Sequence, residues 1–135
     1  MNTFFEFKCD RFQPTPGELD EDSNEFINPG LFARELSTWL KGELEEKGWV
    51  VPHVIVEDWG HWVEVETDNT KPLALCCGCQ DDNAHLIFTD PSKPKGRKWF
   101  FWSYDLTKEM TRLVADVKEL LESDPETEIT QFRED

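Results

Sequence analysis

Basic side chains are scarce in this sequence. Its 135 residues carry 14 Lys and Arg against 29 Asp and Glu, which gives a formal net charge of −15 at pH 7. A chain with this balance is disfavoured as a direct binder of nucleic acid or of an anionic membrane, because both present negative charge. The acidity suits a basic protein partner, such as a nuclease or another nucleic-acid-handling enzyme, although it is also typical of a small accessory domain that carries charge for solubility alone.

Long apolar runs are also missing. No stretch reaches the about 18 apolar residues that a membrane-spanning helix needs. Glu6 interrupts the apolar start of the chain, which argues against a secretory signal, so we expect a cytoplasmic protein. The four Cys should then be reduced thiols that form no disulfides.

The sequence motifs of common catalytic and cofactor sites are absent as well. There is no phosphate-cradling glycine pattern and no G-x-S-x-G nucleophile motif. Cys76, Cys77, Cys79 and Cys9 do not show the repeated pairs of a structural zinc site. We therefore interpret them as core residues and predict no metal, no cofactor and no catalytic residue.

Cys79 and His85 offer one catalytic alternative, as a thiol and an imidazole on either side of a turn. Such a thiol needs a depressed pKa, whereas the neighbouring Asp81 and Asp82 would stabilise its protonated form. A small enzyme or ligand-binding domain, with a pocket between sheet and helices, stays the alternative to a purely binding function.

The chain length and the aromatic content predict a single domain spanning residues 1–135. Six Trp and ten Phe supply large side chains for one core. The pattern along the chain is a strand, a helix, several consecutive strands and a second helix, which is typical of an α+β domain. We expect a largely antiparallel sheet of about five or six strands, with the two main helices packed on one face.

Two segments are expected to lie outside this core. Residues 13–27 are rich in acids and have little to bury, so we predict an exposed acidic loop. Residues 126–135 can add a short edge strand through Ile129 and Phe132 or remain frayed, and the pattern favours neither outcome.

The helix ends carry recognisable signals. Asn28 suits the N-cap of the first helix and Pro29 its first helical position. Gly48 suits the left-handed position after the last turn, with Trp49 folding back in a Schellman ending. Asp105 is the expected N-cap of the second helix.

Residues 50–67 form the stretch around which the sheet is expected to assemble. Two apolar, β-branched runs flank a turn at Asp58-Trp59-Gly60, and Pro52 places the first run at an edge or in a bulge. The second run alternates, so that one face holds His61, Val63 and Val65 and the other holds Trp62, Glu64 and Glu66.

The same stretch is the candidate for function. Two tryptophans amid carboxylates combine an anchor that can be desolvated with charge that steers a basic partner. The alternative is that one of the two indoles folds back over the core. We predict a partner-binding surface composed of Glu57, Asp58, Trp59, His61, Trp62, Glu64 and Glu66.

One basic block stands out, and it is formed by Lys93, Lys95, Arg97 and Lys98 beside Trp99 and Trp102. Basic and aromatic side chains together can stack on nucleic acid. With the whole chain at −15, we interpret the block as an edge hairpin that its lysines protect from aggregation.

The residues from Glu57 to Trp62, read as Glu-Asp-Trp-Gly-x-Trp, follow an Asn-Pro-Gly helix start at Asn28. This combination resembles a pattern found in small bacterial proteins without an assigned activity. The resemblance implies a bacterial or phage origin and an α+β fold, and it carries no catalytic residue across.

Size and charge lead to a functional hypothesis. We expect a non-enzymatic acidic protein that engages and inhibits a basic macromolecule, as toxin-immunity proteins and phage anti-defence inhibitors do. That class enters by analogy of size and charge. No feature of the sequence specifies an oligomeric state.

Overall fold

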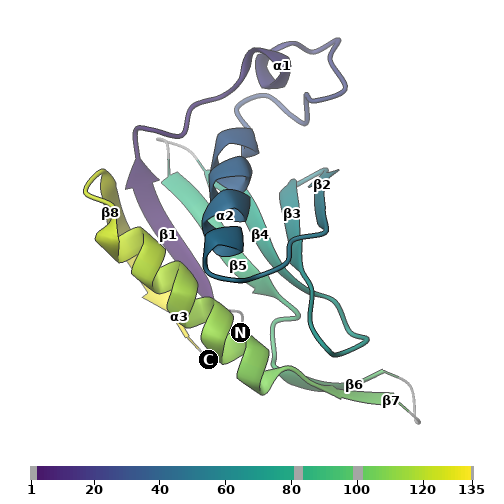
Figure 1. The fold of residues 1–135 in the computed structure, drawn as a ribbon. Helices are drawn as coiled ribbons and strands as arrows, with labels where there is room; N and C mark the ends of the chain where they lie inside the picture. Colours follow the sequence, from purple (N-terminus) through teal and green to yellow (C-terminus); the bar gives the residue numbers. More distant parts are fainter. Residues whose placement is uncertain (1–2, 81–83, 99–101, 135) are drawn as a thin grey trace.

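The computed structural model describes residues 3–80, 84–98 and 102–134. They fold into a six-stranded antiparallel sheet, two long helices and a separate two-stranded hairpin (Figure 1), which confirms the predicted α+β fold. The strands are β1 (Phe4–Cys9), β2 (His53–Glu57), β3 (Gly60–Val65), β4 (Leu73–Gln80), β5 (Ala84–Asp90), β6 (Lys95–Lys98), β7 (Trp102–Asp105) and β8 (Thr127–Arg133). The helices are α1 (Pro16–Leu19), α2 (Arg34–Glu46) and α3 (Thr107–Ser123).

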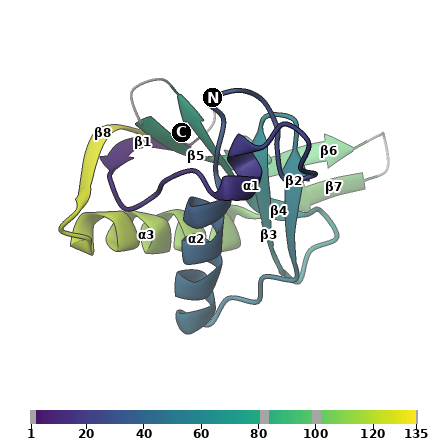
Figure 2. The ribbon, with the colours of Figure 1, turned by 90° about the horizontal axis from the view of Figure 1, so that it is seen from above.

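The six strands of the main sheet are ordered β2-β3-β4-β5-β1-β8, and every neighbouring pair is antiparallel. Helices α2 and α3 lie on one side of this sheet (Figure 2), and the opposite side is called the open face below. Within the described residues, no helix is both long and apolar enough to cross a membrane. The core lies between helices and sheet, and its fully buried members include Phe5, Phe7, Leu36, Leu40, Leu75, Leu113 and Leu121.

Strand β4 runs between β3 and β5, inside the sheet. Its residues from Leu73 to Cys77 are all buried, on both faces. A strand that is covered on both sides need not alternate between apolar and polar residues, which explains this uninterrupted apolar run. Cys76 and Cys77 are therefore core residues, as predicted, and Cys9 is buried as well, whereas Cys79 is half-buried.

Helix α2 begins at Arg34, so the predicted start at Asn28 and Pro29 was wrong. Its N-cap residue, Ala33, makes no side-chain capping hydrogen bond. Instead, Oε2 of Glu18 accepts hydrogen bonds from the backbone N–H groups of Ala33 (2.8 Å) and Arg34 (3.1 Å). The pair Asn-Pro is as typical of turns as of helix starts, and an acceptor from elsewhere in the chain decided where the helix begins.

Glu18 also corrects the prediction of an exposed acidic loop over residues 13–27. Part of that segment forms α1, and a reciprocal capping box between Thr15 and Glu18 caps the N-terminus of this helix. Oε1 of Glu18 accepts hydrogen bonds from the backbone N–H (3.0 Å) and the hydroxyl (3.2 Å) of Thr15. These donors replace water, so the carboxylate tolerates being only 3% exposed. The acids at 20–22 are exposed, as predicted.

The end of α2 confirms its prediction. Gly48 has a φ of 97°, a conformation that glycine adopts at little cost. The backbone N–H of Trp49 donates to the carbonyl of Leu44 at 3.0 Å, the long hydrogen bond of a Schellman ending. The signal could be read from the sequence because all of its parts lie within a few residues.

Helix α3 begins at Thr107 with Leu106 at the N-cap, so the prediction of Asp105 as the N-cap was wrong by one residue. Asp105, one residue earlier, still satisfies the first turn, because its Oδ1 accepts from the backbone N–H (3.0 Å) and the hydroxyl (2.6 Å) of Thr107. These two hydrogen bonds lower the pKa of Asp105, since they stabilise its charged form.

The C-terminal segment forms a strand, the first of the two outcomes that the sequence left open. Strand β8 pairs with β1 and forms one edge of the sheet. Phe132 stacks on Phe5, with ring centroids 4.7 Å apart, and Ile129 also packs against the core. These apolar contacts account for the order of β8, because an edge strand without them would gain little from pairing.

Candidate functional site

The hairpin of β2 and β3 has the alternation that the sequence predicts. His61, Val63 and Val65 are buried towards the helices, while Trp62 and Glu64 are half-buried on the open face. Strand β2 is the outermost strand of the sheet, which agrees with the edge position predicted from the proline before it. The hairpin therefore presents one face and one edge to the surroundings.

The pairing register extends the hairpin into an apolar row across the open face. Ile55 pairs with Trp62, Trp62 with Cys76, Cys76 with Phe88, and Phe88 with Phe4. Side chains of residues that pair directly lie on the same face of a sheet. We call this set the open-face row: Ile55, Trp62, Cys76, Phe88 and Phe4.

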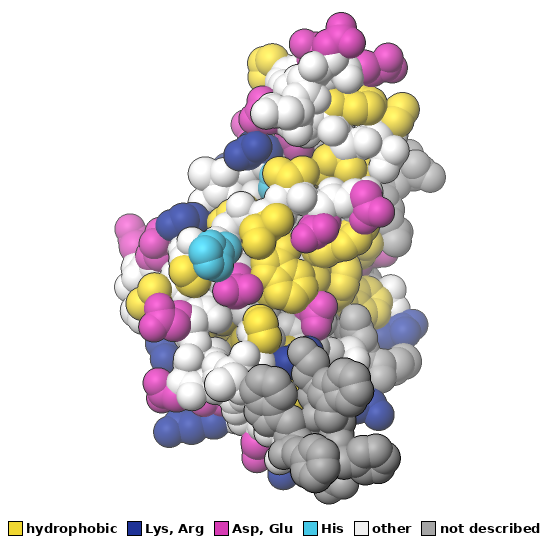
Figure 3. Space-filling model, turned by 90° about the vertical axis from the view of Figure 1, so that its right-hand side faces the viewer, with side chains coloured by type: hydrophobic (Ala, Val, Ile, Leu, Met, Phe, Trp, Pro, Cys, Tyr) yellow, Lys and Arg dark blue, Asp and Glu magenta, His cyan; other side chains and the backbone are white. Residues whose placement is uncertain are grey.

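Trp59, in the turn, lies against this row. Its ring centroid is 5.9 Å from that of Phe88, and the residue is 38% exposed. Ile55, in the row, is 44% exposed, and Val56, on the opposite face of β2, is 40% exposed. Figure 3 shows the molecule from the side of the β2 edge, where hydrophobic side chains gather with carboxylates among them. The indoles of Trp59 and Trp62 are both partly exposed, so a partner can contact part of each ring.

The predicted carboxylates are close by, but they are not paired with cations. Within the described part of the chain, Glu57, Asp58, Glu64 and Glu66 take part in no ion pair. Oε1 of Glu64 accepts a hydrogen bond from the Nε1–H group of Trp62 at 3.2 Å. Acids on the helices, by contrast, include several that are neutralised by Lys or Arg, such as Glu45. The hairpin thus carries negative charge that no described Lys or Arg neutralises.

His61 does not belong to this exposed surface, contrary to the prediction. It is 1% exposed, and its Nδ1 lies 2.7 Å from the hydroxyl oxygen of Ser37 on α2. Burial lowers the pKa of His61, and the positive charge of Arg34 lowers it further. The residue faces the core because it shares its strand face with two valines, and its role is to tie β3 to α2.

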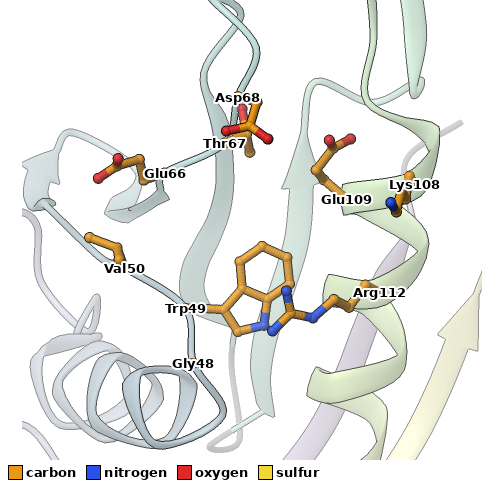
Figure 4. Close-up of a pocket in the computed structure, with 9 residues that line it drawn as sticks. All are labelled: Gly48, Trp49, Val50, Glu66, Thr67, Asp68, Lys108, Glu109 and Arg112. Atoms are coloured by element: carbon orange, nitrogen blue, oxygen red, sulfur yellow. The ribbon is translucent and has the colours of Figure 1, made fainter.

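Glu66 follows β3 and lies apart from the open face, at the wall of a pocket of about 320 Å³. In this pocket the guanidinium of Arg112 lies over the ring of Trp49, 4.2 Å from its centroid (Figure 4). The indole N–H of Trp49 donates to Oδ2 of Asp116 at 2.8 Å. Two more acids, Asp68 and Glu109, line the pocket. Its only aromatic ring is therefore already engaged by side chains of the chain itself.

The alternative pair, Cys79 and His85, is brought together as cross-strand partners. The thiol of Cys79 accepts from the backbone N–H of Phe32 and donates to the carbonyl of Gly30, both at 3.2 Å. His85 is fully buried, its Nε2 donates to the carbonyl of Cys9 at 3.2 Å, and burial lowers its pKa. The pocket at Trp49 includes neither residue of the pair.

The other thiols are poorly suited to nucleophilic or metal chemistry. Burial raises the pKa of Cys76 to about 12 and that of Cys77 higher still. A protonated thiol is a weak nucleophile and a weak metal ligand. Among the residues that the structure describes, no three His, Cys, Asp or Glu side chains are grouped as a metal ion requires.

The basic block falls in the small second sheet. Strands β6 and β7 pair as a hairpin that projects from the main sheet (Figure 1), and Nζ of Lys95 lies 3.8 Å from Oδ2 of Asp105. Trp99 lies outside the described residues. The predicted hairpin is present, and its two strands form a separate sheet from the strands of the open-face row.

Phe88 and Phe4 also belong to the row, although neither was predicted as a site residue from the sequence. Both alternate with buried neighbours in β5 and β1, so their outward position could be predicted. Their alignment with Trp62 could not, because it depends on strand order and register. Comparison with protein-family models, with curated proteins and with solved structures gives no match to this chain.

Proposed function

We propose that this chain is a non-enzymatic binding protein whose open face engages a basic macromolecular partner. The observation that carries the proposal is the placement of unpaired carboxylates around an apolar row whose members, apart from the buried Cys76, are exposed or half-buried. Glu57 and Glu64 flank Ile55 and Trp62 on the same face of the hairpin. Because neither acid is neutralised within the described part of the chain, both can attract a cationic surface.

The two kinds of group have different roles in such an interface. Unscreened carboxylates speed the approach of a basic partner and select against acidic ones. Indole rings that lose their water on contact supply most of the affinity, about 2 kcal/mol or more for a central aromatic anchor. A tryptophan that is already held by a hydrogen bond, as Trp62 is by Glu64, loses little side-chain freedom on binding.

The finer role that we propose is inhibition. A basic partner such as a nuclease uses its cationic groove to hold a phosphate backbone. A face that offers carboxylates around aromatic rings can occupy that groove in place of nucleic acid. Immunity proteins and phage anti-defence inhibitors are the class to which this behaviour belongs, by analogy of size and charge.

Charge reversal at the open face tests the proposal. In the variant Glu57→Lys/Glu64→Lys, two acids of the open face become cations. In the matched control Glu46→Lys/Glu122→Lys, the same charge change is placed at exposed ends of α2 and α3. We expect the open-face variant to lose at least about tenfold in affinity for a partner captured at low salt, and the control to lose much less.

The partner is captured from lysate with the wild-type chain, purified, and titrated against each variant by calorimetry at several salt concentrations. Equal weakening by both variants would mean that net charge alone matters and that the open face is not the interface. If the purified partner is an enzyme, its activity with and without the chain tests inhibition directly.

The pocket at Trp49 favours a second candidate function, the binding of a small charged ligand. Its walls carry both acids and bases within about 320 Å³, a volume within the usual range for small molecules. A ligand seated there would displace Arg112 from the indole of Trp49. A screen of small cations and zwitterions, read by tryptophan fluorescence in the wild type and in Arg112→Ala, would detect such a ligand.

A further inference from the structure

Strand β2 has an edge with which no other described strand pairs. All of its residues except Val54 are exposed, and among residues 3–80, 84–98 and 102–134 it pairs with β3 alone. Its centre is three aliphatic residues in succession, from Val54 to Val56, with no lysine and no proline. Natural proteins normally protect such an edge, because its free backbone groups can pair with another chain.

The opposite edge of the same sheet shows that protection. Strand β8 carries charged or polar side chains at five of its seven positions. Its pairing with β1 also shifts register between Glu6 and Phe7, an irregularity that disrupts regular pairing. The register of β2 with β3 is uninterrupted from His53 to Glu57. Only one of the two edges is therefore suited to receive another strand.

The hairpin register shows which backbone groups are free. Glu57 and Gly60 close the turn of two residues, so they form a hydrogen-bonded pair. Pairs alternate along an antiparallel ladder, and Val56 and Val54 therefore belong to the non-hydrogen-bonded pairs. Their N–H and C=O groups point away from β3. An incoming strand would find two donors and two acceptors at the centre of β2.

We propose that β2 binds its partner by strand addition, and that the partner supplies an extended segment rich in basic residues. This inference rests on the proposed function and specifies how the same surface is used. Side chains of an added strand that point to the open face would lie beside Ile55 and Glu57. Those on the opposite face would lie beside Val54 and Val56. A segment that alternates basic and aliphatic residues would therefore place its cations next to Glu57 and its aliphatic side chains next to the two valines.

Charge complementarity favours a basic extended segment over a second copy of the chain as the strand that pairs with β2. Two copies joined edge to edge would bring together molecules that each carry a net charge of −15, and each copy would contribute Glu57 and Asp58 at the end of its β2 edge. Like charges at close range oppose such pairing unless they are neutralised. A basic segment meets the same acids with attraction.

A pair of synthetic peptides tests the proposal on the full chain. The probe is a ten-residue peptide of alternating lysine and valine, and its control alternates lysine and proline. Both carry the same charge, but the prolines of the control cannot donate backbone hydrogen bonds. We expect the lysine–valine peptide to bind at least about tenfold more tightly in calorimetric titration, as lost backbone hydrogen bonds of this kind predict.

A substitution in β2 tests the same backbone hydrogen bonds by changing the protein in place of the peptide. Val56→Pro removes an outward N–H group and leaves the ladder with β3 in place, whereas Val56→Thr keeps that group. We expect the proline variant to weaken binding of the lysine–valine peptide about threefold to tenfold, and the threonine variant to change it little. Should Val56→Pro unfold, amide exchange of the wild type replaces it, because strand addition must slow exchange at Val54 and Val56 when the probe is bound.

The outcomes separate this inference from the proposed function. Equal affinity for both peptides, with binding still lost in Glu57→Lys/Glu64→Lys, would overturn strand addition and leave a charged docking face. If both peptides bound Glu57→Lys/Glu64→Lys as tightly as the wild type, the result would count against the proposed function itself. A dimer in size-exclusion chromatography that Val56→Pro converts to a monomer would assign the edge to self-association and overturn the proposal.

Discussion

Replacing Glu18 should show that the acidic segment at 13–27 is part of the folded structure. The carboxylate is 3% exposed and accepts hydrogen bonds from four donors, two of which are the first N–H groups at the start of α2. In Glu18→Ala these donors lose their acceptor. An unsatisfied buried donor costs about 1–3 kcal/mol, and loss of an N-cap costs about 0.5–2 kcal/mol. We expect the free energy of unfolding to fall by about 3 kcal/mol.

Equilibrium urea denaturation, followed by circular dichroism, measures this change. The matched control is Glu21→Ala, which removes an exposed acid in the same segment. It should alter stability by less than about 0.5 kcal/mol. Glu18→Gln should fall between the two, because the amide keeps one acceptor oxygen and turns its N–H group towards a donor. A loss in Glu18→Ala no larger than in Glu21→Ala would refute the capping role.

The remaining predictions concern titratable groups in the core. Burial lowers the pKa of both His61 and His85 below their ordinary value of 6.5, so the unfolded chain binds more protons than the folded one just below that pH. The stabilisation that comes from keeping these histidines neutral should be fully present above pH 6.5, and the free energy of unfolding should fall as the pH drops through that value. In His85→Leu, the free energy of unfolding from urea titrations should depend less steeply on pH between pH 7.5 and 5.5. An unchanged slope would show that His85 is not the titrating group. Iodoacetamide at pH 8 should alkylate the half-buried Cys79 first in the native protein, whereas Cys76 and Cys77 should react only in urea. Mass spectrometry of the modified peptides would contradict this order if either buried thiol reacted as fast as Cys79.

Several features of the fold could be predicted because their determinants are local. The Schellman ending at Gly48 involves residues five apart, and the alternation of β3 is visible within one strand. The hydrogen bonds from Thr107 to Asp105 span two residues, which placed the start of α3 to within two residues although the N-cap is Leu106. In each case the side chains that decide the structure stand next to one another in the chain, so the pattern and the physical cause are seen together.

The predictions that were wrong concern features whose determinants lie far apart in the sequence. The start of α2 depends on Glu18, which is fifteen residues before Ala33. The burial of His61 is matched by a hydrogen bond to Ser37 on a different element. The sequence around Asn28 is compatible with both a turn and a helix start, and only the position of a distant carboxylate separates the two. The local sequence is compatible with more than one structure in such cases, and tertiary contacts decide which one forms.

By itself, the sequence determined the net charge, the α+β class, the hairpin at residues 50–67 and the pairing of indoles with acids within it. These follow from composition and from periods of two and of about 3.6 residues. Tertiary structure alone decided that Trp62, Phe88 and Phe4 form one row and that β2 is an open edge. The physical reason is that strand order and register are fixed by contacts between segments far apart in the chain, which no single segment encodes.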